Sequence, residues 1–276
     1  MKRLTLPPRV RVRARSKGQR RLRGLLTLMI ALVGFGFLFT LVTPAPHQAE
    51  AGAVDETQIA AGAAIYVNSC ITCHGSNLQG VTDRGPSLIG VGQAANYFQV
   101  ATGRMPLADQ GAQAPRKEPL YSASEIAALG AYIQANGGGP QVPLAADGTS
   151  ATLRDNAAVA KGAELYRLNC ASCHNFTGKG GALSQGKYAP ALDQATDSEI
   201  YAAMLSGPEN MPKFSDGQLT PDEKVAIVTY VQSAKASLDP GGYGLGGFGP
   251  VSEGFFAFIV GMGLIVGVML WMGARA

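Results

Sequence analysis

All four cysteines of this 276-residue chain lie in two short motifs that could hold a redox cofactor. One is Cys70-Ile71-Thr72-Cys73-His74, and the other, 100 residues later, is Cys170-Ala171-Ser172-Cys173-His174. The C-x-x-C-H pattern is the attachment signal for a c-type haem. Two thiols about one helical turn apart can add to the two vinyl groups on one porphyrin edge, and the adjacent histidine then lies under the iron. The motifs therefore predict two covalently bound haem c groups, with His74 and His174 as iron ligands.

Other uses of four cysteines explain the pattern less well. A tetrahedral zinc site built from all four would leave two histidines at identical offsets unexplained. A thioredoxin-like redox pair would need a βαβ setting, which this sequence does not predict. A disulfide within either C-x-x-C pair would close a very tight loop. Haem attachment is the interpretation that uses all six motif residues.

The second iron ligand is predicted to be methionine by elimination. His47 is the only histidine outside the motifs, so this chain cannot supply two histidines to both haems. Methionine is the common alternative, and His/Met ligation raises the reduction potential. Outside the terminus and the apolar segments, the methionines are Met105, Met204 and Met211. We predict Met105 in the first copy and Met211 in the second, because both precede a proline; Met204, in a helix-like stretch typical of a core position, is the alternative to Met211.

Two prolines follow the motifs at similar places, Pro86 and Pro190. A proline carbonyl in such a loop can accept the free ring N–H of the proximal histidine, which fixes the ring and tunes the iron. The alternative is a loop proline without a special role. We expect the carbonyls of both prolines to hold the histidines.

The motifs belong to an internal repeat. Gly62 and Tyr66 recur at an offset of 100 as Gly162 and Tyr166, and Arg104-Met105-Pro106 corresponds to Asn210-Met211-Pro212. Four-residue spacing places each Gly–Tyr pair on one helical face, where glycine permits a close helix crossing. We expect these pairs to pack against the helix that closes each copy.

Start signals precede each closing helix. Ser122 and Glu125 stand before the apolar positions of the first, and Thr220 stands before those of the second, with Pro221 at the first helical position. The composition of the chain also indicates its division into parts. Gly137 to Pro140 and the polar stretch after it cannot build a core, and their composition predicts a linker. The predicted parts are a basic tail (1–24), an apolar segment (25–43), domain 1 (52–138), a linker (139–155), domain 2 (156–238), a Gly-rich neck (239–253) and a C-terminal apolar helix (254–273).

The charge distribution predicts topology rather than nucleic-acid binding. Ten of the 23 Lys and Arg residues precede Gly24, whereas residues 52–274 hold 12 basic and 18 acidic residues. The basic tail runs into the apolar stretch Leu25 to Val42, and a second apolar stretch runs from Phe255 to Met272. Basic flanks of spanning segments stay in the cytoplasm, so residues from about 52 to 250 are expected to face outwards from the cell membrane, with no nucleic-acid partner.

The first apolar segment is either an uncleaved anchor or a signal peptide. Its 18 residues are long for a signal-peptide core and just long enough to span. Ala49-Glu50-Ala51 has the small-x-small form of a cleavage site, although it lies far from the apolar core. Gly263 and Gly267 in the second segment form a small-xxx-small pattern that lets two membrane helices approach closely.

With Gly62, Tyr66, Cys70, Cys73, His74 and Met105, and the matching set that ends in Met211, each copy resembles a class I cytochrome c domain. That resemblance implies an all-α fold of three to five helices around the haem. The whole plan, with a basic leader, an apolar segment, two such domains, a Gly-rich neck and a C-terminal span, resembles the dihaem cytochrome c subunit of the actinobacterial cytochrome bcc complex.

This second resemblance implies a role in quinol oxidation. The Rieske iron–sulfur protein would reduce one haem, the cytochrome b subunit would be a partner, and electrons would leave towards a terminal cytochrome c oxidase. The chain itself would be an electron carrier within a quinol–cytochrome c reductase. The alternatives are a dihaem cytochrome c that serves a periplasmic dehydrogenase or an oxidase, and a dihaem peroxidase, which needs one haem with an openable distal position.

Overall fold

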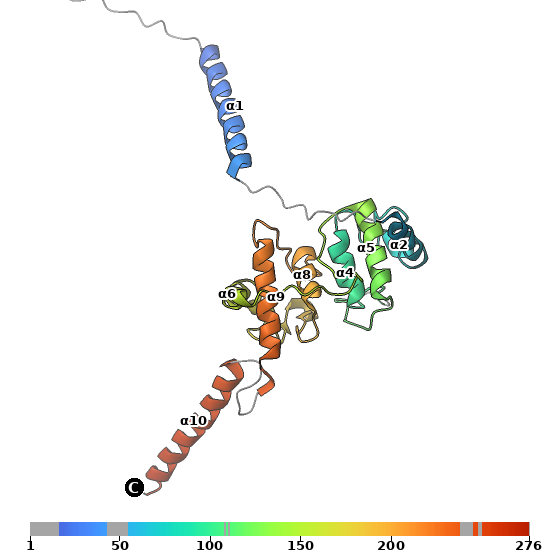
Figure 1. Cartoon of the computed structure of the whole chain (residues 1–276). Helices are drawn as coiled ribbons and strands as arrows, with labels where there is room; N and C mark the ends of the chain where they lie inside the picture. Colours follow the sequence, from blue (N-terminus) through green and yellow to red (C-terminus); the bar gives the residue numbers. More distant parts are fainter. Residues whose placement is uncertain are drawn as a thin grey trace, which may run out of the picture. The chain divides into compact units, whose positions relative to one another are not determined.

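The computed structural model describes residues 17–42, 55–107, 109, 111–237, 245–247 and 250–275. Helix α1 (Lys17–Val42) belongs to one unit, and every described residue from Asp55 onward belongs to another. The described residues are mostly helical, which confirms the all-α class (Figure 1). Their only strands are β1 (Gly181–Ala182) and β2 (Tyr188–Ala189), an antiparallel pair in which Gly181 lies opposite Ala189.

The repeat seen in the sequence is a repeat of helices. The first copy contains α2 (Glu56–Ser69), α3 (Ile71–His74), α4 (Gly92–Ala101) and α5 (Ala123–Gly137). The second contains the 3₁₀ turn η1 (Asn156–Ala158), α6 (Val159–Asn169), α7 (Ala171–His174), α8 (Asp197–Ser206) and α9 (Pro221–Ala236). Between α7 and α8 the second copy also carries β1, η2 (Ser184–Gly186) and β2.

The closing helices α5 and α9 begin where their start signals predict. The Ser122 side chain accepts from the backbone N–H of Glu125, and the Glu125 carboxylate accepts from the backbone N–H of Ser122. Thr220 and Glu223 form the same reciprocal pair at the start of α9, with Pro221 as its first residue. Each capping box satisfies backbone donors that the first helical turn leaves unpaired.

Each first helix crosses its closing helix at a glycine, as expected. A Cβ on Gly62 would collide with the backbone carbonyl of Ala128 in α5, and a Cβ on Gly162 would collide with that of Ala226 in α9. The neighbouring tyrosines pack beside these crossings. The ring centroids lie 5.2 Å apart both in the pair Tyr66–Tyr132 and in the pair Tyr166–Tyr230.

The two copies pack into one compact unit. Helix α4 contacts α5 of its own copy and α8 of the other (Figure 1). Buried side chains from both copies join in one apolar cluster, in which Phe98 and Val100 of α4 and Ile200 and Ala203 of α8 take part. A shared core is a stronger connection than two small domains on a linker would have.

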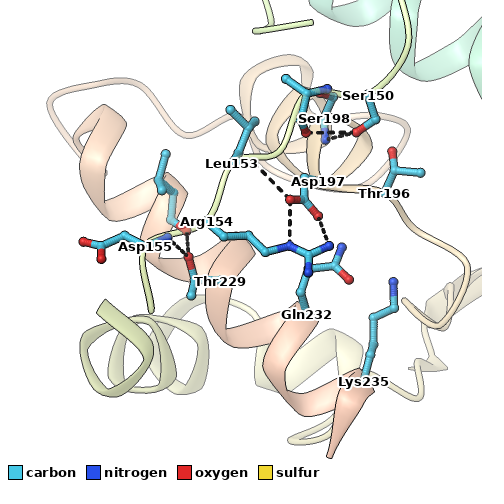
Figure 2. Close-up of polar contacts among 12 residues, drawn as sticks. Ser150, Leu153, Arg154, Asp155, Thr196, Asp197, Ser198, Thr229, Gln232 and Lys235 are labelled. Atoms are coloured by element: carbon cyan, nitrogen blue, oxygen red, sulfur yellow. Dashed lines mark hydrogen bonds and ion pairs between the residues drawn. The ribbon is translucent and has the colours of Figure 1, made fainter. Parts of the chain in front are cut away.

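Residues 139–155 are more ordered than their composition indicates. Val142 is buried, and the Ser198 hydroxyl at the start of α8 donates to the carbonyl of Pro143 at 2.7 Å. Asp197 beside it accepts from the Leu153 backbone N–H and from the Arg154 side chain (Figure 2). The segment is therefore a strap along α8, held by polar groups that a composition count cannot pair.

Among the described residues, two helices are long and apolar enough to cross a membrane, by length and composition. The apolar windows are Arg21–Phe39 in α1 and Val251–Gly273 in α10 (Pro250–Gly273), and neither is buried within the protein. A short turn, η3 (Leu245–Gly247), precedes α10. The cleavage-like Ala49-Glu50-Ala51, residues 52–54 and most of the neck between 239 and 249 lie outside the described residues.

Candidate haem-binding sites

Each motif forms a single helical turn directly after the first helix of its copy. The Cys70 backbone N–H donates to the carbonyl of Tyr66 at 2.9 Å, and the His74 N–H donates to that of Cys70 at 2.9 Å. The second copy repeats both bonds, from Cys170 to Tyr166 at 2.8 Å and from His174 to Cys170 at 2.9 Å. This turn brings the two thiols and the imidazole of each motif together, which is the placement that covalent haem attachment requires.

The histidine rings are held by the carbonyls of the two prolines singled out in the sequence. His74 Nδ1 lies 2.8 Å from the Pro86 carbonyl oxygen, and His174 Nδ1 lies 3.0 Å from that of Pro190. Because a carbonyl only accepts, the bond assigns the ring proton to Nδ1 and leaves the Nε2 lone pair for a metal. Burial lowers the pKa of His174, although the bond to Pro190 works in the opposite direction. A neutral imidazole is the form that binds iron.

The cysteines lack the features of a reactive dithiol. Burial raises the pKa of Cys70 to about 11 and that of Cys170 to about 12, and none of the four cysteines forms a disulfide. Redox-active pairs have thiol pKa values lowered by nearby positive charge or a helix N-terminus. Within the described residues, no three His, Cys, Asp or Glu side chains are grouped to hold a metal ion, so the four cysteines do not converge on a zinc site.

The second copy contains a cavity of about 420 Å³ that brings its predicted site residues together. Cys170, Cys173 and His174 line it, and so do both candidate methionines, Met204 and Met211. The arrangement fits a haem, since the two thiols, the imidazole and a thioether all reach one mainly apolar space. Met204 belongs to the buried core on α8, as its helical context predicts, whereas the half-buried Met211 lies in the loop after α8 and packs against that core.

In the first copy, Met105 lies in the loop after α4 in the same relation to its helix. Its side chain is half-buried and packs against the apolar cluster, and its backbone N–H donates to the carbonyl of Gln99 at 2.9 Å. The Tyr66 hydroxyl donates to the carbonyl of Gly75 at 2.6 Å. That last bond secures the chain just after the motif, as the bond from Tyr166 to Asn175 does in the second copy.

Part of the cavity in the second copy is formed by residues that the sequence analysis did not predict. Phe98, Arg104, Gln113 and Arg116, all from the first copy, line it. Gln113 is bonded on both sides to the backbone of Tyr188 in β2, donating to its carbonyl at 2.7 Å and accepting from its N–H at 3.0 Å. One difference between the copies could have pointed to Arg104. The second copy has the neutral Asn210 at this position, although the Met-Pro pair that follows is the same in both copies.

Comparison with known families gives one match for each copy. Residues 59–137 match the family described as cytochrome c, and residues 157–231 match the family described as cytochrome c oxidase, cbb3-type, subunit III. Each family model thus covers a single copy of the repeat.

Relatives of similar length cover nearly the whole chain. A Corynebacterium diphtheriae protein named cytochrome bc1 complex cytochrome c subunit is 52% identical over 276 residues, which is 96% of this chain and 98% of the relative. A Mycobacterium bovis protein of the same name is 53% identical over 266 residues, with 96% and 95% covered. A Mycobacterium leprae protein of that name is 53% identical over 253 residues, with 91% and 87% covered.

Proposed function

Because the chain belongs to the family of cytochrome c subunits of the cytochrome bc1 complex, we propose that it carries electrons out of a quinol-oxidising complex at the outer face of the cell membrane. Its two cytochrome c domains carry two covalently bound haem c groups. Electrons enter from the Rieske centre and leave towards a terminal cytochrome c oxidase, so the chain is the carrier subunit of a quinol–cytochrome c reductase.

The observation that carries this proposal is the closely similar geometry of the two motifs. In both copies a one-turn helix presents two thiols and a histidine whose Nδ1 is held by a proline carbonyl. Bound haem iron supplies reversible one-electron transfer. We assign the attachment and ligation of the haems to Cys70, Cys73, His74 and Met105 in the first copy and to Cys170, Cys173, His174 and Met211 in the second.

The residues on both sides of each iron define the chemistry. With a histidine and a methionine of this chain as its ligands, a bound haem iron would have no open position for a substrate, which would suit a carrier and disfavour a peroxidase. The carbonyls of Pro86 and Pro190 fix the histidine rings and thereby hold the iron's surroundings constant between its two charge states. The apolar lining of the cavity excludes water, which limits the reorganisation that accompanies a change of charge.

The partners follow from the family rather than from a surface of this chain. We propose the cytochrome b subunit and the Rieske protein as neighbours, with α1 and α10 in the membrane. The resemblance of residues 157–231 to an oxidase subunit concerns one copy alone, whereas the likeness to bc1 subunits extends over 96% of the chain. Service to an oxidase or a dehydrogenase without a bc complex is therefore the weaker candidate.

Orientation follows from charge. The ten basic residues before Gly24 keep the N-terminus in the cytoplasm. Two spans then return the C-terminus, with Arg275 after α10, to the same side. The haem domains between them face outwards, where covalent haem attachment and a terminal oxidase are both within reach.

The test is to isolate the chain from native membranes in mild detergent and record reduced-minus-oxidised spectra of the complex that comes with it. We expect haem b together with haem c, a Rieske protein, and reduction of haem c by quinol. Haem c alone, without cytochrome b or Rieske protein, would contradict the assignment to a bc complex. Turnover of hydrogen peroxide with a high-spin haem would instead favour the peroxidase.

A further inference from the structure

The wall of the second haem cavity that belongs to the first copy contains a buried cation. Arg104 lies in the loop after α4 and is 7% exposed, and its guanidinium carbon sits 4.9 Å from the centroid of the Phe98 ring. Both residues line the cavity. Arginine stays protonated in proteins, so this positive charge has been removed from water and placed beside the space that the second haem takes.

Arg104 is left with an unsatisfied donor. Its Nη1 is buried and has no hydrogen-bond partner among the described residues. Leaving a buried charged donor unpaired costs more than leaving a neutral one unpaired. An anion in the cavity would offset this buried positive charge.

Two carboxylates that line the same cavity already accept other hydrogen bonds. Glu199 receives two hydrogen bonds from Arg116, at 2.9 and 3.0 Å, and a third from the backbone N–H of Thr196. Glu209 accepts from the backbone N–H of Ala114 at 2.9 Å. Neither acid is hydrogen-bonded to Nη1 of Arg104. A counter-charge for Arg104 is therefore expected from the occupant of the cavity.

We propose that Arg104 of the first copy binds a propionate carboxylate of the haem in the second copy. Haem carries two propionates, and a guanidinium matches a carboxylate with two parallel N–H groups. The inference rests on the proposed attachment of haem at Cys170 and Cys173. It makes the second haem site a joint product of the two copies, because the first copy supplies the cation that the cofactor needs.

The second copy has no arginine at the position that corresponds to Arg104, so it does not offer the same contact to the first haem. Asn210, at the corresponding position of the second copy, is neutral, and its side-chain oxygen accepts from the Lys187 ammonium at 2.9 Å. A cation beside a haem disfavours the additional positive charge of the oxidised iron. Arg104 consequently raises the reduction potential of the second haem and acts as a positioning residue, not as an iron ligand.

The experiment is a redox titration of the full haem-loaded chain in detergent, resolved into its two haems, for the wild type, Arg104→Gln and Arg104→Lys. The Met211→Leu variant identifies the second haem. We expect Arg104→Gln to lower the reduction potential of that haem. At a fixed applied potential its oxidised-to-reduced ratio should rise several-fold, where a tenfold rise corresponds to about 59 mV for one electron. The first haem should stay unchanged, and Arg104→Lys should restore part of the shift.

Arg154→Gln is the matched control, because Arg154 is another arginine beside α8, where it pairs with the buried Asp197, and it does not line the cavity. It should leave both potentials in place. Unchanged potentials in Arg104→Gln, or an equal fall of both haems, would overturn the proposal, and so would a lysine variant that matches the glutamine variant. Two haems per chain in a Cys170→Ser, Cys173→Ser variant would instead show that the proposed attachment is wrong.

Discussion

The guanidinium of Arg116 in the first copy donates two hydrogen bonds to the carboxylate of Glu199 in the second, 3.0 Å from Nη1 to Oε2 and 2.9 Å from Nη2 to Oε1. The Glu199 side chain is 5% exposed, and the same carboxylate accepts from the backbone N–H of Thr196 in the capping box of α8. One buried acid thus starts α8 and fastens the first copy to it, beside the cavity that both copies line.

Removal of Arg116 should loosen this junction. Arg116→Ala leaves a buried carboxylate with one hydrogen bond, so we expect the free energy of unfolding of the haem-loaded chain to fall by about 1–3 kcal/mol. Arg116→Lys keeps the charge but not the bidentate geometry, so its free energy of unfolding should lie between those of the wild type and Arg116→Ala. Urea unfolding followed by far-UV circular dichroism measures the difference. Equal midpoints for the wild type and Arg116→Ala would show that the junction contributes nothing.

The glycines at the two helix crossings should not tolerate a methyl group. Gly62→Ala and Gly162→Ala each direct a Cβ into a backbone carbonyl of the closing helix. Backbone cannot move aside as a side chain can, so we expect losses of about 1–3 kcal/mol or more in unfolding free energy.

Gly130→Ala is the control for these two variants. Gly130 is also helical, but a Cβ there would meet the flexible side chain of Gln93 and the side-chain amide of Asn96. The higher helix propensity of alanine offsets part of that crowding. If Gly130→Ala destabilised the chain as much as Gly62→Ala does, close helix crossing would not be the reason for the repeated glycine.

The parts of each site that come from one copy could be predicted from the sequence. The thiols and histidines follow from a motif whose spacing is set by one helical turn, and the prolines Pro86 and Pro190 follow from their place after it. The closing helices were predictable because a capping box such as that of Ser122 and Glu125 is written in adjacent residues. In all these cases the interaction spans few residues, so the pattern is visible in the chain.

The contribution of one copy to the other could not be predicted in this way. The contact of Arg116 with Glu199 joins residues 83 positions apart, and no periodicity connects them. Asp197 pairs with a segment whose polar, Gly-rich composition is typical of a free linker. Such pairs depend on how two packed copies face each other, which the sequence of either copy alone does not determine.

A buried lysine in α9 should be replaceable by an apolar residue. Lys224 is fully buried, and its ammonium donates to Asp216 at 2.6 Å and to the Leu219 carbonyl at 2.9 Å. The first copy has Ile126 at the corresponding position after its capping box. Because the Asp216 carboxylate can be hydrated when the ammonium is gone, Lys224→Met should stay within about 1 kcal/mol of the wild type, the cost of leaving the Leu219 carbonyl without its hydrogen bond.

Removal of the acidic partner should destabilise the protein more than removal of the lysine. Asp216→Asn leaves the buried ammonium without a counter-charge, for which we expect a loss of about 3–5 kcal/mol. Asp216 itself is 38% exposed, so it can return to water when Lys224 is replaced. Thermal unfolding of Lys224→Met and Asp216→Asn under the same conditions shows which variant is less stable. A Lys224→Met variant less stable than Asp216→Asn would contradict this account.

Asp197 should be needed for the strap formed by residues 139–155 to hold to α8. Its carboxylate accepts from the Leu153 N–H at 3.0 Å and from Arg154 at 2.9 and 3.1 Å (Figure 2). Asp197→Asn removes the charge from these bonds, and we expect a loss of about 1.5–3 kcal/mol. The Leu153 amide should exchange its hydrogen faster in that variant. Asp147→Asn, in an exposed turn of the same segment, is the control and should leave Leu153 unchanged.

The choice between Met211 and Met204 can be settled by one pair of variants, since both side chains line the second cavity. Met211→Leu should lower the potential of the second haem, because it removes the thioether that favours reduced iron, and the opened position should bind added imidazole. Met204→Leu is a near volume-conserving change in the core, so it should cost less than about 1.5 kcal/mol in stability and leave both potentials unchanged. Met105→Leu should repeat the effect at the first haem alone. If Met204→Leu opened the iron and Met211→Leu did not, the core methionine of α8 would be the ligand, and the loop after α8 would serve only to close the cavity.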